Sequence, residues 1–260
     1  MKREITAIIV LSFVFVTTPF FVYAKKNSAT PRNVTTPSIL MYHEVMETDE
    51  NSGPNLKAFS ISPKLLEDEF KYLSDNNYNT PFVSDFFVAR ERGDGVYPQK
   101  TVMLTFDDGT EDVYSVVLPL LKKYNIKITV FANPGFDGTN GRMSYAQLRE
   151  LSESGLVEIG AHTMTHVRLQ EISDDDAREE IIYSKNRLEM ITGKPVRAFA
   201  YPFGKFGVRE EKMVAEAGMS FAFAADESHG KNYTNTLALP RITIGGQESL
   251  KTFIRAVRAW

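Results

Sequence analysis

Cysteine is absent from all 260 residues of the chain. Neither a disulfide framework nor a lipid-modified cysteine is therefore available to stabilise or anchor the protein. A strong net charge is also lacking, because 30 basic and 33 acidic residues leave a formal charge of -3. Such a balance creates no basic field that would attract nucleic acid, so we expect no nucleic-acid partner. Stability must instead come from a hydrophobic core.

The composition supports a folded core, with 43% hydrophobic and 24% charged residues, which argues against disorder. No internal repeat or low-complexity tract is evident. The first 24 residues have the features of an export signal, and roughly 230 residues follow them. That length suffices for one large α/β domain and is marginal for two.

The N-terminus predicts export. Two basic residues precede an apolar run from Ile5 to Tyr23, which ends on the small residue Ala24. Because the run is long for a signal peptide, residues 1–24 are either a cleaved signal or a retained membrane anchor. Both alternatives place the protein outside the cytoplasm, in the periplasm, on the cell surface or secreted. Residues 25–37 are rich in Ser, Thr, Asn and Pro and predict a linker, so the domain should occupy 38–260.

Strand-like and helix-like segments alternate at least five times in this domain. The expected strands cover 38–43, 102–106, 127–131, 157–161, 196–201, 220–224 and 239–244. The expected helices cover 62–75, 113–124, 144–154, 173–192, 208–217 and 250–257. Residues 44–59 predict a long loop, 82–87 fit either strand or short helix, and Pro119 should kink its helix. The alternation favours a parallel sheet with crossover helices, as a closed barrel or a doubly wound layer.

Polar residues follow the ends of several predicted strands. They are His43, the Asp107-Asp108-Gly109 sequence, His162 and Tyr201-Pro202. Active sites of barrels and open α/β sheets collect at the carboxyl ends of strands, so these residues should meet on one face. By itself, the Asp-Asp-Gly sequence would equally suit a loop entering a helix, with acids near its N-terminus.

His162 and His166 are two of only four histidines and stand four residues apart. That spacing places both imidazoles on one side of a helical turn. With one carboxylate they would supply three metal ligands and leave positions open for water or substrate. Two surface histidines capping a loop are the alternative. The same ligands could hold iron for oxygen chemistry, but the second aspartate favours a hydrolase, which needs a base.

Three motifs in this order resemble those of the NodB-homology polysaccharide deacetylases. They are Thr105-Phe106-Asp107-Asp108-Gly109, His162-Thr163-x-x-His166 and Tyr201-Pro202-Phe203-Gly204. The resemblance extends from Ile39 to Ile244. It implies a distorted (β/α) barrel with fewer than eight complete repeats and metal-dependent removal of acetyl groups from N-acetylated sugars.

The resemblance also implies roles for individual residues. Asp108, His162 and His166 would bind the divalent metal, most commonly zinc, although nickel, cobalt or iron suit the same ligands. Asp107 would be the general base that takes a proton from the attacking water. The backbone N–H of Phe203, after Tyr201 and Pro202, would help the metal to stabilise the oxyanion.

The chain departs from the family pattern at the general acid. Many members carry a histidine after a leucine near the C-terminus, whereas this chain has Leu239-Pro240-Arg241. His43 and His229 are the remaining candidates, and we favour His43 because it follows a strand end. A hydrogen-bonded structural role is the alternative for His43. Arg197 or Arg241 could keep Asp107 ionised through a charge-assisted bond, with Arg241 favoured.

A tyrosine-histidine pair at the domain start resembles the exported poly-N-acetylglucosamine deacetylases of biofilm systems. The sequence thus predicts an exported, metal-dependent deacetylase of an amino-sugar polymer such as poly-β-1,6-N-acetylglucosamine. Peptidoglycan or chitin-oligomer deacetylation is the alternative within enzymes, and a carbohydrate-binding module without turnover is the alternative outside them. The expected partner is an N-acetylated polysaccharide, with membrane anchoring through residues 1–24 as a further expectation and no prediction of oligomeric state.

Overall fold

The computed structural model describes residues 37–92, 100–225, 235–246 and 249–258. They belong to the larger of two units into which the chain divides, Thr35–Trp260. The predicted signal or anchor, residues 1–24, lies outside the described residues. Within the described ranges, no helix has both the length and the apolar character that crossing a membrane requires.

Seven parallel strands form the main sheet, in the spatial order β8-β7-β6-β5-β4-β1-β9. They are β1 (Ile39–Tyr42), β4 (Met103–Phe106), β5 (Ile128–Ala132), β6 (Val157–Ala161), β7 (Ala198–Ala200), β8 (Phe221–Phe223) and β9 (Ile242–Thr243). Two shorter strands, β2 (Glu44–Val45) and β3 (Ser60–Ile61), pair separately. Because every pair in the main sheet is parallel, all carboxyl ends of its strands lie along one edge.

The segment from Leu239 to Thr243 connects β8 with β1. Leu239 forms a parallel bridge with Phe223 of β8, and β9 pairs with β1 three residues further on. The sheet therefore curls round on itself. This architecture is the predicted distorted (β/α) barrel with fewer than eight complete repeats.

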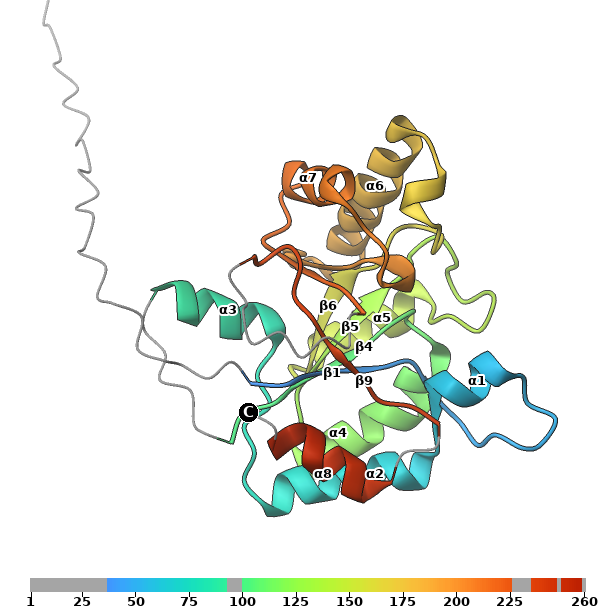
Figure 1. Ribbon diagram of the computed structural model, residues 1–260, viewed down its shortest axis with the longest axis vertical. Coiled ribbons are helices and arrows are strands. Elements are labelled where there is room, and N and C mark those ends of the chain that lie inside the picture. The colour runs from blue at the N-terminus through green and yellow to red at the C-terminus, as the bar shows by residue number, and fades with distance from the viewer. Residues whose placement is uncertain (1–36, 93–99, 226–234, 247–248, 259–260) are drawn as a thin grey trace, which may run out of the picture. The chain divides into compact units, whose positions relative to one another are not determined.

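Helices surround the strands and bury their outward-facing side chains (Figure 1). They are α2 (Pro63–Asp75), α4 (Leu118–Tyr124), α5 (Tyr145–Glu153), α6 (Asp174–Thr192), α7 (Val208–Glu216) and α8 (Leu250–Arg258). In Figure 1, α2, α4 and α8 lie together on one side of the strands and α6 and α7 on the other. The expected helix starts are present, since Ser62, Ser144 and Ser173 each accept a hydrogen bond from the first turn.

Helix α3 (Val83–Arg92) closes the inside of the barrel at the amino ends of the strands. Its buried side chains Val83, Phe86 and Phe87 join inward-facing strand residues in a second apolar cluster. The Phe87 ring stacks on Phe221 of β8 with 5.3 Å between centroids. The amino end of the barrel is therefore filled by apolar side chains. This leaves the carboxyl edge as the side from which the interior can be reached.

Two local expectations need correction, and one open alternative is decided. Residues 44–59 are not one loop, because they contain β2 and a short helix, α1 (Pro54–Phe59). Of the two alternatives for residues 82–87, the helix is the one present, and it begins at Val83. The helix expected over 113–124 is a π-helical turn (Val113–Val117) followed by α4, and Pro119 lies in the first turn of α4. A proline has no N–H to donate, so it is tolerated where a helix begins.

Candidate active site

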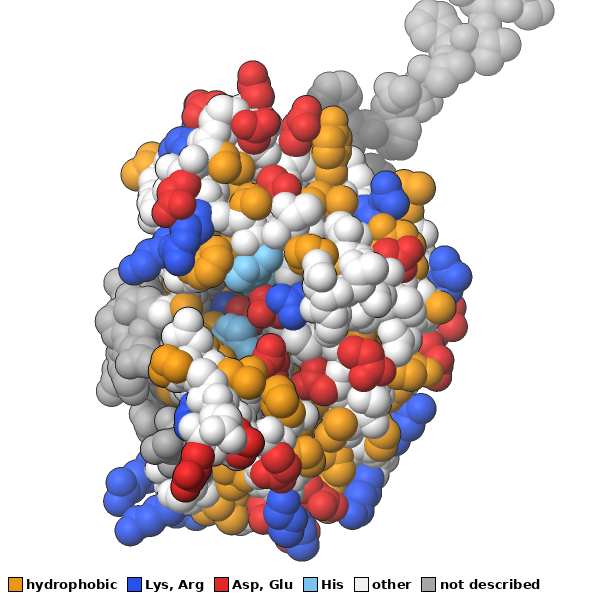
Figure 2. All heavy atoms as spheres, turned by 90° about the vertical axis from the view of Figure 1, so that its right-hand side faces the viewer, with side chains coloured by type: hydrophobic (Ala, Val, Ile, Leu, Met, Phe, Trp, Pro, Cys, Tyr) orange, Lys and Arg blue, Asp and Glu red, His pale blue; other side chains and the backbone are white. Residues whose placement is uncertain are grey.

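The predicted site residues collect at the carboxyl edge of the barrel. His43 follows β1, Asp107 and Asp108 follow β4, and His162 follows β6. Figure 2 shows this edge, where two histidine surfaces lie in a hollow beside acidic and basic side chains. Parallel pairing explains the convergence, because it places the ends of neighbouring strands side by side.

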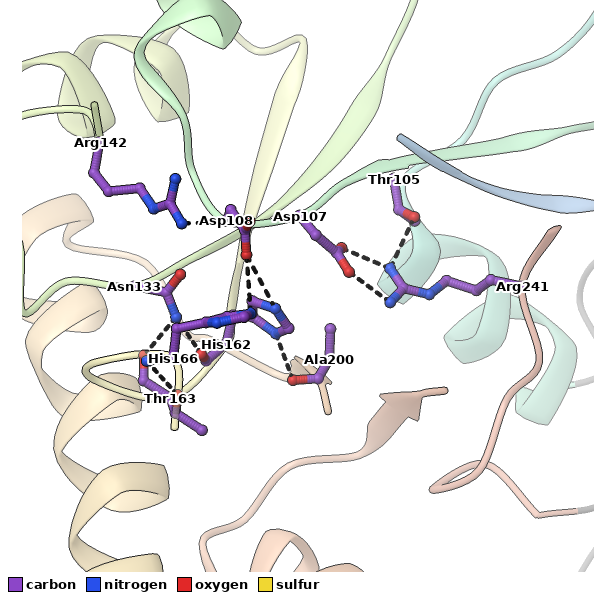
Figure 3. Close-up of polar contacts among 10 residues, drawn as sticks. All are labelled: Thr105, Asp107, Asp108, Asn133, Arg142, His162, Thr163, His166, Ala200 and Arg241. Carbon is purple, nitrogen blue, oxygen red and sulfur yellow. Dashed lines mark hydrogen bonds and ion pairs between the residues drawn. The ribbon is translucent and has the colours of Figure 1, made fainter. Parts of the chain in front are cut away.

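Asp108, His162 and His166 form a group suited to a metal ion. Oδ1 of Asp108 lies 3.4 Å from Nε2 of His162 and 3.2 Å from Nε2 of His166 (Figure 3). One potential ligand atom from each residue lies within 4.8 Å of the other two. Asp108 Oδ1 is buried and accepts no well-aligned hydrogen bond from the described residues. A divalent ion would satisfy this oxygen, so the group fits a metal with nitrogen and oxygen ligands.

A backbone contact orients His162 for this task. Its Nδ1 lies 2.7 Å from the carbonyl oxygen of Ala200, which can only accept a hydrogen bond. Nδ1 therefore carries the proton, and in the neutral ring Nε2 presents its lone pair towards Asp108. Asn133 holds the same loop, since its Nδ2 donates to the carbonyls of His162 and Thr163.

The two histidines do not lie on a helical turn, contrary to the expectation from their spacing. They are brought together by a loop in which Thr163 and His166 have left-handed backbones, with φ of 63° and 58°. The N–H of His166 donates to Thr163 Oγ1 at 3.0 Å, and this bond stabilises the tight bend. Asp108 and Phe203 are also left-handed, with φ of 73° and 58°. Such strain in residues other than glycine is typical of functional sites, where the surrounding contacts over-determine the geometry.

The three metal-site groups have distinct protonation preferences. Burial raises the pKa of Asp108, but the adjacent His162 imidazole and the charges of His166 and Arg142 outweigh burial, so its pKa is strongly lowered. Burial and the positive charge of His162 lower the pKa of His166 to about 4. For His162, burial is outweighed by Asp108 and Asp107, and the pKa is raised. The carboxylate is therefore ionised and the His166 imidazole neutral at pH 7, as metal ligands require.

Asp107 is buried and paired with Arg241. The guanidinium donates from Nη1 and Nη2 to the two carboxylate oxygens of Asp107, each at 2.7 Å. Arg241 is itself held by bonds to Thr105 Oγ1 and the Ala224 carbonyl, at 3.1 and 3.0 Å. Burial opposes ionisation of Asp107, but the charge of Arg241 outweighs it and lowers the pKa. Arg197 precedes the amino end of β7 and so lies away from this edge.

His43 lies in the same site. Its ring packs at a tilt against Phe59 with 4.8 Å between centroids, and its Nδ1 has no hydrogen-bond partner among the described residues. Burial lowers the pKa of His43, and the negative charges of Asp107 and Asp108 partly offset that effect. The other candidate acid, His229, lies outside the described residues.

The Tyr-Pro-Phe-Gly motif forms one wall of the site. The Tyr201 ring is buried and stacks on Phe206, with 4.2 Å between centroids. Pro202 begins a tight turn whose two hydrogen bonds are donated by Gly204 and Lys205, so the Phe203 N–H is not used by them. The Phe203 ring lies 4.6 Å from the His166 ring.

Sequence reasoning missed two residues that touch the site. Asn133 directly follows β5, so the strand-end signal that identified His43 could have identified it as well. Arg142 lies in the loop before α5, and its Nη2 is 3.3 Å from Asp108 Oδ2. No strand end or periodic pattern marks Arg142, because its position depends on how this loop folds back.

Comparisons with known proteins find similarity to polysaccharide deacetylases in sequence and in fold. The family model described as polysaccharide deacetylase matches residues 94–222. Poly-β-1,6-N-acetyl-D-glucosamine N-deacetylase of Staphylococcus aureus (strain MSSA476) is 24% identical over 223 residues, covering 81% of this chain and 75% of that protein. The structure of Streptococcus pyogenes deacetylase PplD in complex with acetate matches with a TM-score of 0.77 and 26% identity, over 85% of this chain and 99% of that one. BC0361, a polysaccharide deacetylase from Bacillus cereus, matches with a TM-score of 0.70 and 26% identity, over 85% of this chain and 68% of that one.

Proposed function

Because the chain belongs to the polysaccharide deacetylase family, we propose that it is an exported, metal-dependent enzyme that removes N-acetyl groups from poly-β-1,6-N-acetylglucosamine. It is a hydrolase of amide bonds, so a binding module without turnover is set aside. The proposal of export rests on the signal-like residues 1–24, and the proposal of substrate rests on the Staphylococcus aureus relative and the tyrosine-histidine pair at the domain start.

One observation carries the proposed chemistry: an ionised carboxylate that is not part of the metal group lies directly beside it. Asp108, His162 and His166 would hold the ion, and Asp107 is the adjacent residue, turned instead towards Arg241. A bound divalent ion, most commonly zinc, would lower the pKa of a water and polarise the acetyl carbonyl. Asp107 would accept the proton of that water, because Arg241 keeps it ionised.

The remaining residues would act on the tetrahedral intermediate and the leaving amine. The Phe203 N–H makes no backbone hydrogen bond among the described residues and would donate to the oxyanion. His43 would give the amine its proton. Burial lowers the pKa of His43, so the protonated ring gives up its proton more readily than an ordinary histidine. Fewer molecules carry that proton at neutral pH. The free amine and acetate then leave as products.

The substrate is tested by acetate release from β-1,6-linked N-acetylglucosamine oligomers, with peptidoglycan and chitin oligomers in parallel. We expect release from the β-1,6 oligomers that stops on chelation, returns with zinc, and is lost in Asp107→Asn. Preference for peptidoglycan or chitin oligomers would overturn the proposed substrate. Full activity in Asp107→Asn with metal bound would overturn the proposed base.

A further inference from the structure

The two carboxylate oxygens of Asp108 face different groups. Oδ1 points towards the imidazoles of His162 and His166, at 3.4 and 3.2 Å. Oδ2 lies 3.3 Å from Nη2 of Arg142 (Figure 3). One oxygen of the Asp108 carboxylate thus faces the candidate metal site, and the other faces the Arg142 guanidinium.

The backbone holds Arg142 in this position. Thr110 and Arg142 form an antiparallel bridge, so the loop before α5 pairs with the turn that follows Asp108. Two hydrogen bonds of 2.9 Å flank the bridge, from Met143 N–H to the Gly109 carbonyl and from Glu111 N–H to the Gly141 carbonyl. Arg142 is therefore held by backbone pairing to the residues that directly follow Asp108.

The placement of Arg142 opposes simple metal affinity. Its side chain is only 18% exposed, and its Nε is buried without a hydrogen-bond partner among the described residues. A buried guanidinium beside a group that binds a divalent cation repels that cation. Its contribution must therefore lie in how Asp108 is presented rather than in how tightly the ion is held.

We propose that Arg142 is a positioning residue that reserves Oδ2 of Asp108, so that Asp108 offers the metal Oδ1 alone. This role rests on the proposed metal-binding function. It specifies in addition that Asp108 supplies one donor atom to the metal. With one oxygen and two imidazole nitrogens bound, more positions stay open for water and the acetyl carbonyl than with a two-oxygen carboxylate. The metal therefore keeps open coordination positions for catalysis, and the site binds the metal less tightly.

The test compares wild type with Arg142→Met, which removes the charge but keeps much of the side-chain volume, and with Arg142→Lys, which keeps the charge. Arg168→Met is the matched control, because Arg168 packs over the Phe203 ring beside the site without an ion pair to Asp108. Cobalt(II) affinity is measured by competition with a chelator, and the visible spectrum of the cobalt protein reports its coordination number. Circular dichroism checks that each variant is folded.

We expect Arg142→Met to bind cobalt about tenfold more tightly, the scale on which groups outside the ligand set act on metal sites. Its visible absorption should weaken as Oδ2 becomes an additional ligand, and kcat should fall with little change in KM. Arg142→Lys and Arg168→Met should keep the wild-type affinity and spectrum.

Unchanged affinity and spectrum in a folded Arg142→Met protein would overturn the role of Arg142. Loss of cobalt binding in that variant would also overturn it, because Arg142 would then support binding. If wild type itself binds no divalent metal, the proposed function fails at its first step, a result distinct from either of these.

Discussion

At the scale of single residues, two adjacent carboxylates have different surroundings. Asp107 is enclosed with Arg241, and Asp108 is turned towards the imidazoles by a left-handed backbone. Both side chains are largely buried, and in both cases neighbouring positive charge or hydrogen bonding outweighs the cost of burial. The sequence motif predicted the two adjacent carboxylates, whereas their different surroundings come from contacts with residues far along the chain.

Removing Arg241 should change the pH dependence of the enzyme. In Arg241→Met, burial acts on Asp107 without its counter-charge, so the pKa of Asp107 rises. Because the base must be unprotonated, the acidic limb of the kcat/KM profile should move to higher pH. Loss of one partner of a buried pair should also reduce stability by about 3–5 kcal/mol. A pH–rate series and denaturant unfolding measure both effects, with Arg197→Met as control. An unshifted acidic limb would contradict the role given to Arg241.

His43 can be tested through the leaving group. His43→Ala should slow N-deacetylation by about a hundred- to ten-thousandfold, the usual contribution of a general acid. It should hardly affect hydrolysis of an activated aryl acetate, whose leaving group needs no proton. Parallel rates on the two substrates separate these cases, and metal content should be unchanged. Equal losses on both substrates would point to a structural role for His43.

Metal binding should release a proton in mildly acidic solution. The raised pKa of His162 means that its ring is protonated below that pKa, while His166 stays neutral down to about pH 4. Metal affinity should therefore fall about tenfold per pH unit below the His162 pKa, and more steeply below about pH 4. Calorimetry in buffers of different ionisation enthalpy counts the protons. Affinity independent of pH between about 5 and 6 would contradict this assignment.

At the scale of elements, the strands and most helices can be predicted from hydrophobic periodicity and capping residues. The conformations of the loops that connect them cannot. Short, nearly continuous apolar runs predicted β4, β5 and β6, because parallel strands are buried on both faces. The loop from 162 to 166 was read as helical because a spacing of four suits a helix. Its true bend is made by local hydrogen bonds and two left-handed residues, which the spacing does not encode.

Gly160 of β6 shows how closely the barrel interior is packed behind this loop. A Cβ at Gly160 would lie 2.5 and 2.6 Å from ring atoms of Phe131 and 3.0 Å from the Ala198 carbonyl oxygen. Gly160→Ala should therefore destabilise the protein by about 1–3 kcal/mol and weaken metal binding by displacing His162. Gly53→Ala is the control, because a Cβ there meets nothing within 4 Å. Denaturant midpoints for both variants test this, and equal stability would contradict the packing argument.

At the scale of the whole molecule, the sequence predicted the alternation of strands and helices and the edge at which function collects. It favoured Arg241 as the partner of Asp107 but left the contact between them, 134 residues apart, to the fold. Arg142 and the plugging role of α3 were missed for the same reason. Each depends on a chain reversal whose register is fixed by tertiary packing rather than by local pattern.

The segment that joins β8 to β1 has a consequence for the order of events during biogenesis. Translation delivers β1 to β8 before residue 239 exists, so at that stage the segment that closes the barrel and the guanidinium that pairs with Asp107 have not been made. Arg241 completes the ring and neutralises the buried carboxylate in one act. A truncated chain that ends before Arg241 would therefore lack the charge that keeps Asp107 ionised in the proposed mechanism, and we expect it to be inactive.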